Sequence, residues 1–279
     1  MRPAERLREL LGSDICTTVA QVYDTLSARI AAAVGWEVCK LAGKPAKAAN
    51  LGVPDDVGLA DLADLAMICR AITRVAHVSL VVDADDAGPT PLTARRTVEE
   101  LEAAGAAAIE IQDDVGGRMV PTKLQVAKLR SALAARREGH TVITARTAAV
   151  DLLPMNEALE RIRAYASAGV DAIMLPGWRS RPIAQIQAVA SACELPLCVS
   201  GLEAAAMADP SFLVDARIRF RYLDHYPYRM AVKALYDGFA HLKSGGSADE
   251  LRGSEAPDDV LRLVTRASDF AEWERTSRR

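Results

Sequence analysis

The chain has 279 residues, of which half are hydrophobic and only 5% are aromatic. Its 34 basic and 37 acidic residues give a formal net charge of −3 and an isoelectric point near 5.9, which argues against a general nucleic-acid-binding protein. The length allows one large α/β domain or two small ones, and no apolar run is long enough to span a membrane.

Strand-like and helix-like stretches alternate along the chain to about residue 243. An amphipathic helix is predicted over residues 2–11, and apolar runs then predict eight strands, most of them followed by a helical pattern. The predicted strands are residues 15–19, 38–43, 78–85, 107–113, 141–147, 172–175, 196–200 and 218–224. The predicted helices are residues 21–34, 59–75, 91–104, 121–137, 156–168, 182–192 and 226–242, with a weaker helical stretch after residue 200. Residues 44–56 are predicted to form a loop.

Eight strand–helix alternations in roughly 230 residues are typical of a (β/α)8 TIM-type barrel. A doubly wound open sheet is the alternative, but no glycine-rich phosphate turn follows the first predicted strand. In a barrel the active site lies at the carboxyl ends of the strands. The polar residues expected at that end are Asp83, Asp85, Gln112, Asp113, Arg146, Asp224 and His225.

The most distinctive stretch is VSLVVDADDAG, residues 78–88, in which an apolar run ends in three carboxylates within four residues. Because alternate residues of a strand point the same way, Asp83 and Asp85 are expected to project together. Two like charges at the end of a buried strand are costly unless a cation, hydrogen bonds or water offset them. A divalent cation such as Mg²⁺ meets this need with one or two carboxylates and several waters. The alternative is an acidic loop in solvent.

Five cysteines with no CxxC pair, no zinc-type spacing and no signal peptide before them predict a reduced cytoplasmic protein.

Residues 244–257 are rich in Gly, Ser and charged residues. They are interpreted as a linker between a barrel of residues 1–243 and a C-terminal helix of residues 258–279. That helix is expected to pack on its own barrel or, by exchange, on a neighbouring subunit of a homo-oligomer, a dimer or tetramer.

Six stretches together carry a resemblance to a known family. They are YDTLSARIAAAVGWE (23–37), LGVPD (51–55), VVDAD (81–85), RRTVEELEAAGAAAIEIQD (95–113), ITART (143–147) and DHYPYRMAVKALYDG (224–238). In this order and spacing they resemble the isocitrate lyase/phosphoenolpyruvate mutase superfamily, most closely its oxaloacetate decarboxylase branch. The resemblance implies a barrel that needs Mg²⁺ or Mn²⁺, binds a 2-oxo acid or its enolate, and acts on a C–C or P–C bond beside a carboxylate.

The resemblance also implies a metal site. Asp83 matches the direct metal ligand of the family. Asp85 and Asp55 match carboxylates that hold metal-bound waters, and Gln112 stands where the family has a further carboxylate. Gln112 accepts a hydrogen bond from such a water but adds no charge.

Other positions match residues that contact the substrate in the family. Arg146 matches the arginine that holds the substrate carboxylate, and His225 matches a histidine near the substrate. The backbone of Ala42, Gly43 and Lys44 matches the segment around the oxyanion end of the substrate. Further candidates for ligand contact, from their places after the first and sixth predicted strands, are Tyr23, Asp24 and Trp178.

Several departures from the family pattern cluster at the same site. The family run D-A-D-x-G-Y-G-N reads DADDAGPT at residues 83–90, and the branch's small hydroxyl residue is Lys44 here. The loop at residues 114–120 is short and lacks the Lys-Lys-Cys-Gly-His segment of isocitrate lyases, which argues against isocitrate or methylisocitrate cleavage. Glu110 either restores charge near the metal or forms a core ion pair with Arg219 and Arg221.

Three hypotheses follow. The first is a Mg²⁺-assisted lyase that decarboxylates a 2-oxo-carboxylate or cleaves its C–C bond. The second is different chemistry, such as phosphonomutase, hydrolase or condensation activity, on a bulkier substrate admitted by the short loop. The third is a non-catalytic relative that has lost its metal.

Overall fold

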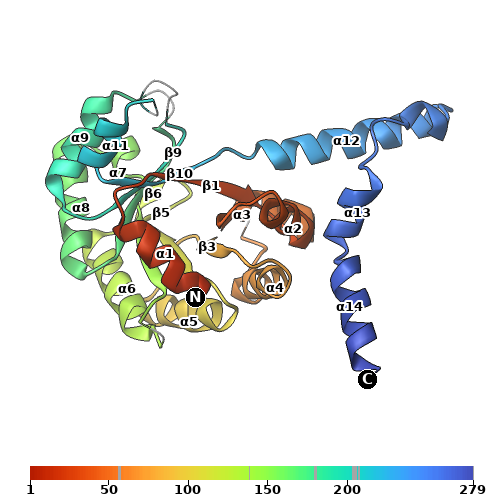
Figure 1. Cartoon of the computed structure of the whole chain (residues 1–279). Helices are drawn as coiled ribbons and strands as arrows, with labels where there is room; N and C mark the ends of the chain where they lie inside the picture. The colour runs from red at the N-terminus through yellow and green to blue at the C-terminus, as the bar shows by residue number, and fades with distance from the viewer. Residues whose placement is uncertain (56–57, 138, 179–180, 203–205, 207, 279) are drawn as a thin grey trace.

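The structure is a computed structural model that describes residues 1–279 except 56–57, 138, 179–180, 203–205, 207 and 279. Its parallel strands close into a barrel in the order β1-β10-β9-β8-β7-β4-β3-β2 (Figure 1), which confirms the predicted (β/α)8 fold. The barrel strands are β1 (Thr17–Val22), β2 (Val38–Leu41), β3 (Ser79–Asp83), β4 (Ala108–Gln112), β7 (Val142–Arg146), β8 (Ala172–Leu175), β9 (Leu197–Ser200) and β10 (Ile218–Tyr222).

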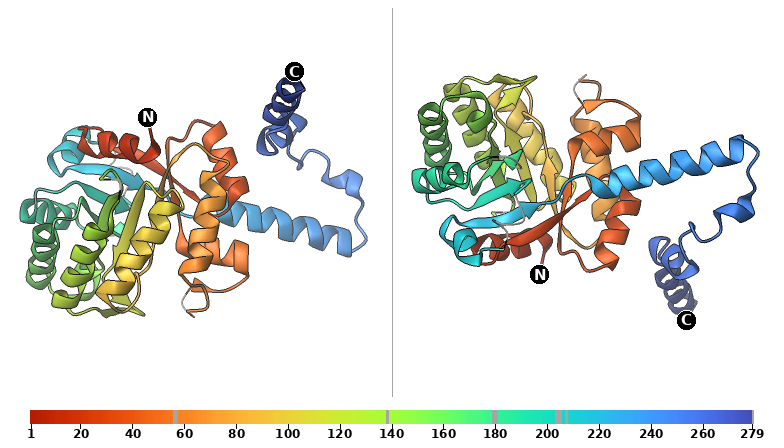
Figure 2. Two further views of the ribbon diagram at one scale, coloured as in Figure 1. Left: turned by 90° about the horizontal axis from the view of Figure 1, so that it is seen from below. Right: turned by 90° about the horizontal axis from the view of Figure 1, so that it is seen from above.

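Helices surround the barrel on its outer face (Figures 1 and 2). They are α2 (Thr25–Ala33), α4 (Leu62–Thr73), α5 (Pro91–Ala103), α6 (Thr122–Ala135), α8 (Met155–Ala168), α9 (Ile183–Ala192) and α11 (Pro210–Asp215). Apolar residues between these helices and the strands form the larger hydrophobic core. A short helix, α7 (Ala149–Leu152), follows β7, and a small hairpin, β5 (Asp114–Val115) with β6 (Arg118–Met119), follows β4.

The stretch after β2 is a helix, so the predicted loop over residues 44–56 is wrong for most of its length. Helix α3 (Gly43–Leu51) follows β2 almost directly. Its Pro45 lies in the first turn, where a missing N–H is tolerated, and three alanines favour the helix beyond it. The helix ends at Gly52, whose φ of +68° is a left-handed conformation that glycine adopts without strain.

Side chains inside the barrel change character along the strands. At the amino ends the interior is apolar, with Val19, Val38 and Val81, and helix α1 (Pro3–Gly12) closes this end with Leu7 and other leucines. Two residues further along β2, β3 and β4, the inward positions carry charged side chains that are described below. The apolar end therefore gives a rigid base beneath a polar layer.

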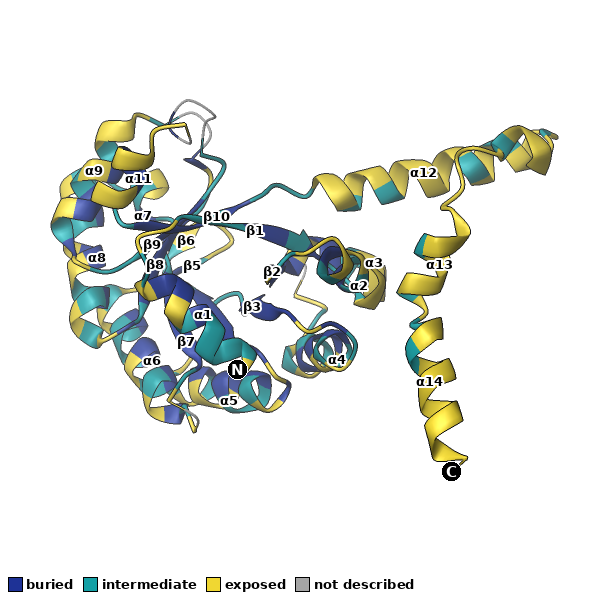
Figure 3. Ribbon diagram, in the orientation of Figure 1, coloured by how far each residue is buried: buried dark blue, intermediate teal, exposed yellow. Residues whose placement is uncertain are grey.

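The C-terminal part of the chain leaves the barrel. Helix α12 (Tyr226–Lys243) projects outward and has no buried residue (Figure 3). After the 3-10 helix η3 (Ala248–Leu251), the expected single C-terminal helix is two helices, α13 (Asp258–Val264) and α14 (Ala267–Ser277). The chain turns between them at Arg266, whose φ is +56°. Of these elements, α13 packs against α2, where Arg29 Nη2 donates to the carbonyl of Leu263 at 2.8 Å.

No helix among the described residues combines the length and the apolar character that crossing a lipid bilayer requires.

Candidate active site

A cavity of about 590 Å³ opens at the carboxyl ends of the strands. Residues from seven barrel strands, from α3 and from the β5–β6 hairpin line it. The sequence-predicted residues that line this cavity are Ala42, Gly43, Lys44, Asp55, Asp83, Asp85, Gln112, Arg146 and His225. The cavity thus brings together residues that lie far apart in the chain, from Gln21 to His225.

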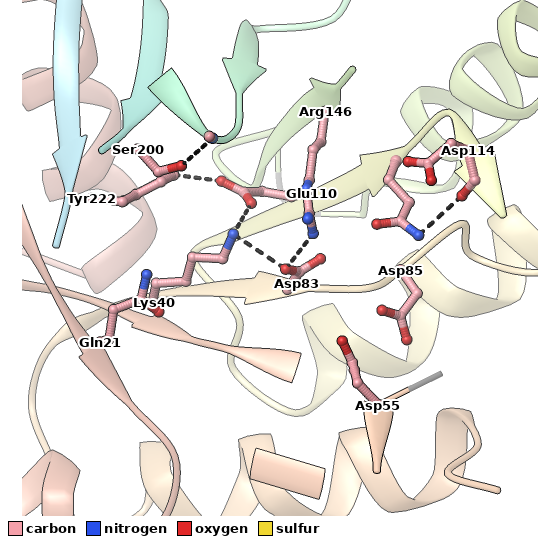
Figure 4. A network of polar contacts seen from close by, with 12 residues as sticks. Gln21, Lys40, Asp55, Asp83, Asp85, Glu110, Asp114, Arg146, Ser200 and Tyr222 are labelled. Atoms are coloured by element: carbon pink, nitrogen blue, oxygen red, sulfur yellow. Dashed lines mark hydrogen bonds and ion pairs between the residues drawn. The ribbon is translucent and has the colours of Figure 1, made fainter. Parts of the chain in front are cut away.

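Asp83, the last residue of β3, has two carboxylate oxygens in different surroundings (Figure 4). Oδ2 accepts a hydrogen bond from Arg146 Nη1 at 2.6 Å and lies 3.2 Å from Lys40 Nζ. Oδ1 is buried and has no hydrogen-bond partner among the described residues. Burial alone would raise the pKa of Asp83, but the charges of Arg146 and Lys40 outweigh it and hold the pKa below its usual range.

Lys40 of β2 and Glu110 of β4 form a buried ion pair inside the barrel. The other oxygen of Glu110 accepts a hydrogen bond from the hydroxyl of Tyr222 on β10 at 2.5 Å. In β3 and β4, Asp83 and Glu110 are paired residues of the sheet, so two carboxylates lie side by side inside the barrel. Lys40 Nζ contacts both of them and offsets their repulsion.

The expected pairing of Glu110 with Arg219 or Arg221 is wrong. Phe220 and Tyr222 of β10 belong to the barrel interior, and side chains alternate along a strand, so Arg219 and Arg221 point to the other side. Arg219 Nη2 bonds Asp14 Oδ1 at 2.9 Å, and Arg221 Nη2 bonds the hydroxyl of Thr18 at 2.8 Å.

Asp85 and Asp55 form an outer acidic pair that Lys47 of α3 bridges. Lys47 Nζ donates to Asp85 Oδ2 at 2.7 Å and to Asp55 Oδ1 at 2.9 Å, and the two carboxylates point toward each other in Figure 4. Burial and the charge of Asp83 raise the pKa of Asp85, against the effect of Lys47. Asp85 lies beyond β3 with φ +47°, so the strand-alternation argument does not apply to it, although its carboxylate lines the same cavity as Asp83.

The amino-terminal end of α3 forms one wall of the cavity. Ala42 is the residue before the helix, and Gly43 begins it. A Cβ atom on Gly43 would lie 3.6 Å from Asp85 Oδ1 and 3.7 Å from Asp55 Oδ1, so this backbone lies directly against the acidic pair. The first N–H groups of a helix have no partner within it and favour an anion, and Lys44 adds a positive charge beside them.

Gln112 and His225 complete the lining. Gln112 Nε2 donates to the carbonyl of Asp114 at 3.0 Å, which directs its amide nitrogen toward the β5–β6 hairpin. His225 Nδ1 is buried without a hydrogen-bond partner among the described residues. Burial lowers the pKa of His225 below its ordinary value of 6.5, and the charges of Lys40 and Lys44 act in the same direction, against that of Asp224.

Three predicted ligand-contact residues do not line this cavity. The ring of Tyr23 packs edge-on against Tyr228 with centroids 5.3 Å apart. Asp24 instead caps α2 by accepting from the backbone N–H of Ser27 at 2.7 Å. Trp178, expected at the cavity mouth, is only 2% exposed, because its ring is packed into the hydrophobic core.

Asp113 also turns away from the cavity. Its carboxylate accepts hydrogen bonds from the hydroxyls of Thr147 and Tyr165, both at 2.7 Å, and from the backbone N–H of Ala148 at 3.0 Å. These contacts join β4 to the segment after β7 and to α8. Asp113 therefore serves the structure beneath the site.

Comparisons with known proteins agree with this geometry. The sequence profile of the family described as Phosphoenolpyruvate phosphomutase matches residues 7–242. The chain belongs to the phosphoenolpyruvate phosphomutase family. It is 36% identical to an oxaloacetate decarboxylase of Paraburkholderia xenovorans (strain LB400), over 97% of this chain and 92% of that protein.

Solved structures of the phosphoenolpyruvate mutase/isocitrate lyase superfamily share the fold. An oxaloacetate acetylhydrolase in complex with its product oxalate has a TM-score of 0.84 at 25% identity and covers 99% of this chain and 98% of that one. A phosphonopyruvate hydrolase in complex with oxalate and Mg²⁺ has a TM-score of 0.85 at 24% identity, over 98% of both chains.

The residues of this phosphoenolpyruvate phosphomutase family member fit one divalent cation with few protein ligands. Among the described residues, no group of three or more His, Cys, Asp or Glu side chains is arranged to bind a metal directly. Asp83 Oδ1 is nevertheless a buried carboxylate oxygen to which no described residue donates a hydrogen bond. Mg²⁺ is commonly held by one or two carboxylates and retains several waters, so one direct ligand with Asp85, Asp55 and Gln112 around it suits this ion.

Sequence reasoning missed two lysines of the site, Lys40 and Lys47. Lys40 is the one charged residue of β2, VCKL, which is otherwise apolar, and a charge within a buried strand is a signal for an inward-facing polar layer. The pattern of residues 44–56 predicts a loop, and a loop does not fix the direction in which the side chain of Lys47 points. In a helix, Gly43 and Lys47 share one face, which would have placed Lys47 at the cavity.

Proposed function

We propose that this protein is a lyase that needs Mg²⁺ or Mn²⁺ and acts on a 2-oxo-carboxylate, by decarboxylation or by cleavage of a C–C bond. The proposal rests on Asp83, which lines the cavity and has one carboxylate oxygen bonded to Arg146 and the other buried without a partner among the described residues. The relatives named oxaloacetate decarboxylase support the substrate class, because their likeness extends over nearly the whole chain.

Arg146 is the group that we assign to the substrate carboxylate. Only its Nη1 contacts Asp83, and the side chain remains partly exposed to the cavity. A guanidinium group binds a carboxylate through two parallel hydrogen bonds. The other anionic end of a substrate would face the amino terminus of α3 and Lys44.

Breaking the C–C bond next to a carbonyl sends the bonding electron pair into an enolate, whose oxygen carries the negative charge. A divalent cation, when bound, supplies positive charge beside that oxygen. In cleavage of a hydroxyl-bearing substrate, the neutral ring of His225 accepts the hydroxyl proton at Nδ1 and returns it to the enolate carbon. In decarboxylation, carbon dioxide leaves, no hydroxyl proton is transferred to His225, and the enolate carbon takes up a proton from water.

A second cavity favours a substrate larger than oxaloacetate, on which the same site would perform cleavage, hydrolysis or condensation. This cavity of about 420 Å³ shares Gly43, Lys47 and Asp85 with the first one. Its other walls include Leu65 and Ile68 of α4. An apolar substituent on the substrate would fit there, beyond the Lys47–Asp85 ion pair.

Isothermal titration with oxalate, a stable analogue of the enolate, tests the proposal. We expect wild-type protein to bind oxalate in the presence of Mg²⁺, and Asp83→Asn to weaken this binding by about 100-fold or more, since a charged ligand group is lost. Glu99→Gln, on the outer face of α5, is the matched control and should bind as the wild type does. If the wild type does not bind oxalate with metal present, the proposal is wrong.

Substrate turnover then distinguishes a decarboxylase of oxaloacetate from an enzyme that acts on a larger 2-oxo acid. Oxaloacetate and 2-oxo acids with a 3-alkyl group should be compared by kcat/KM. Preference for oxaloacetate supports the decarboxylase function, and turnover that appears only with the larger acids supports the bulkier substrate.

We further propose that the protein acts in the cytoplasm as a homo-oligomer, a dimer or a tetramer. The five cysteines are free thiols, which suits a reducing compartment. Helix α12, which has no buried residue, supports association with further copies of the chain.

A further inference from the structure

Lys40 places an ammonium group in the floor of the cavity. Its side chain is only 5% exposed, yet the residue lines the cavity. Nζ contacts Glu110 Oε2 and lies 3.2 Å from Asp83 Oδ2. An ammonium group has three N–H donors, and no third acceptor contacts Lys40 in the part of the chain that the structure describes. One donor is therefore left for a ligand.

The surroundings of Lys40 hold this ammonium group in position. Glu110 is fully buried and its second oxygen is occupied by the hydroxyl of Tyr222. The ring of Tyr222 lies beside Lys40 Nζ, at 4.9 Å from its centroid. The ion pair with Glu110, itself hydrogen-bonded to Tyr222, restricts the movement of Lys40. Lys40 therefore needs little rearrangement to contact a ligand.

The other cations of the site are engaged with carboxylates or with the substrate. Lys47 bridges Asp85 and Asp55 at the rim, and Arg146 is assigned to the substrate carboxylate. When a ligand carboxylate binds Arg146, it competes with Asp83 Oδ2 for the same guanidinium. Lys40 then remains between Asp83 and the ligand, as a fixed positive charge beneath the reacting atoms.

We propose that Lys40 is a catalytic residue that donates a hydrogen bond to the oxygen on which negative charge develops, so that the cavity binds an enolate-like anion even without a divalent cation. This inference rests on the proposed function and deepens it. A fixed donor in a site screened from water stabilises developing charge without reorganisation. The metal then strengthens anion binding but is not its only source.

Oxalate titration in the presence of EDTA tests this role, because it measures binding with no metal and no turnover. We expect the wild type to bind oxalate in EDTA and Lys40→Met to weaken this binding by about 10- to 100-fold, as for loss of a charged hydrogen bond. Lys40→Arg keeps a charged donor and should retain part of the affinity.

Two further variants separate this effect from damage to the fold. Lys40→Met leaves Glu110 buried without its cation, which is destabilising, so the double variant Lys40→Met with Glu110→Gln removes both charges and leaves Tyr222 a neutral partner. It should lose EDTA-resistant binding while melting as a folded protein by circular dichroism. Lys123→Met is the control, since Lys123 is an exposed lysine of α6 that does not line the cavity. It should bind oxalate as the wild type does.

The titrations with Mg²⁺ and with EDTA distinguish the role of Lys40 from the proposed function. If the wild type binds oxalate with Mg²⁺ but not in EDTA, the role of Lys40 is overturned while the proposed function stands. The role is also overturned if the folded double variant binds in EDTA as tightly as the wild type. Absence of binding under both conditions contradicts the proposed function itself, and the inference with it.

Discussion

At Asp83 the two oxygens of one carboxylate have different neighbours, and the site depends on this difference. Oδ2 is held by Arg146 and Lys40, whereas Oδ1 is buried without a partner. A buried oxygen with no partner is costly, and a divalent cation would remove that cost. The cationic neighbours keep the carboxylate ionised, which is the form that binds a metal.

His225 gives the site a predicted pH dependence. Because burial lowers its pKa below 6.5, the ring stays neutral at pH 7 and can accept a proton. As pH falls through this lowered pKa, the ring becomes protonated and can no longer do so. At saturating Mg²⁺, kcat/KM for C–C cleavage should therefore fall on the acid side with a midpoint below 6.5.

The variant His225→Asn serves as the comparison. It should lower kcat/KM by about 100-fold at neutral pH, the usual contribution of one proton-transfer group, and should remove the acid limb that belongs to His225. A profile in the variant that is parallel to the wild-type profile would contradict the assignment to His225.

Of the residues that line the cavity, the sequence pointed to Asp83 and Arg146 but not to Lys40 or Lys47. Asp83 and Arg146 lie in the stretches that carry the family resemblance, so their roles could be assigned by position. Lys40 could not be paired in advance, because its partners Glu110 and Asp83 come from other strands and meet it only when the barrel closes. Burial and long-range pairing are properties of the fold and are not visible in a local pattern.

Among the elements, the strands were predicted well and the short segments were not. Strand β8 has the predicted bounds, and the other barrel strands differ from the predictions by a few residues at most, because fully buried strands leave unbroken apolar runs. Helix α3 was missed because it is short, contains Pro45 and follows a strand without a loop. The consequence was functional, since α3 supplies Lys47 and the cavity wall.

The β5–β6 hairpin lies beside the cavity, at the position where the family resemblance implies a longer loop. Gly116 and Gly117, both with positive φ, form its turn and line the cavity. The short loop expected from the sequence is present, and its hairpin form gives it backbone pairing of its own. The cavity is therefore bordered by a short hairpin with its own backbone pairing.

In the whole molecule, α12 contacts the barrel near its first turn, where Tyr228 packs on Tyr23, and the rest of the helix projects away from the barrel. Helix α12 follows β10 and projects from the barrel in each view (Figures 1 and 2). It exposes large apolar side chains, among them Leu235 at 62% and Phe239 at 71%, which is a costly arrangement for an isolated subunit. We predict that α12 packs against a second copy of the chain.

Light scattering coupled to size exclusion measures this association. The wild type should have twice or four times the 29.9 kDa mass of one chain. Leu235→Glu combined with Phe239→Glu places charges on the apolar face and should give the mass of one chain. Lys233→Ala, on the same helix, should leave the assembly intact. A wild-type protein that runs as a monomer would exclude the packing of α12 against a second copy.

We propose that Asp83 anchors a divalent cation next to a 2-oxo acid anion held by Arg146. A crystal structure of the wild-type protein with Mg²⁺ and oxalate would test this arrangement. We expect a cation about 2.1 Å from Asp83 Oδ1, with Arg146 turned onto an oxalate carboxylate and Lys40 Nζ within hydrogen-bond distance of an oxalate oxygen. Oxalate bound elsewhere, or Asp83 still bonded to Arg146 with no cation beside it, would show that Asp83 does not anchor the metal.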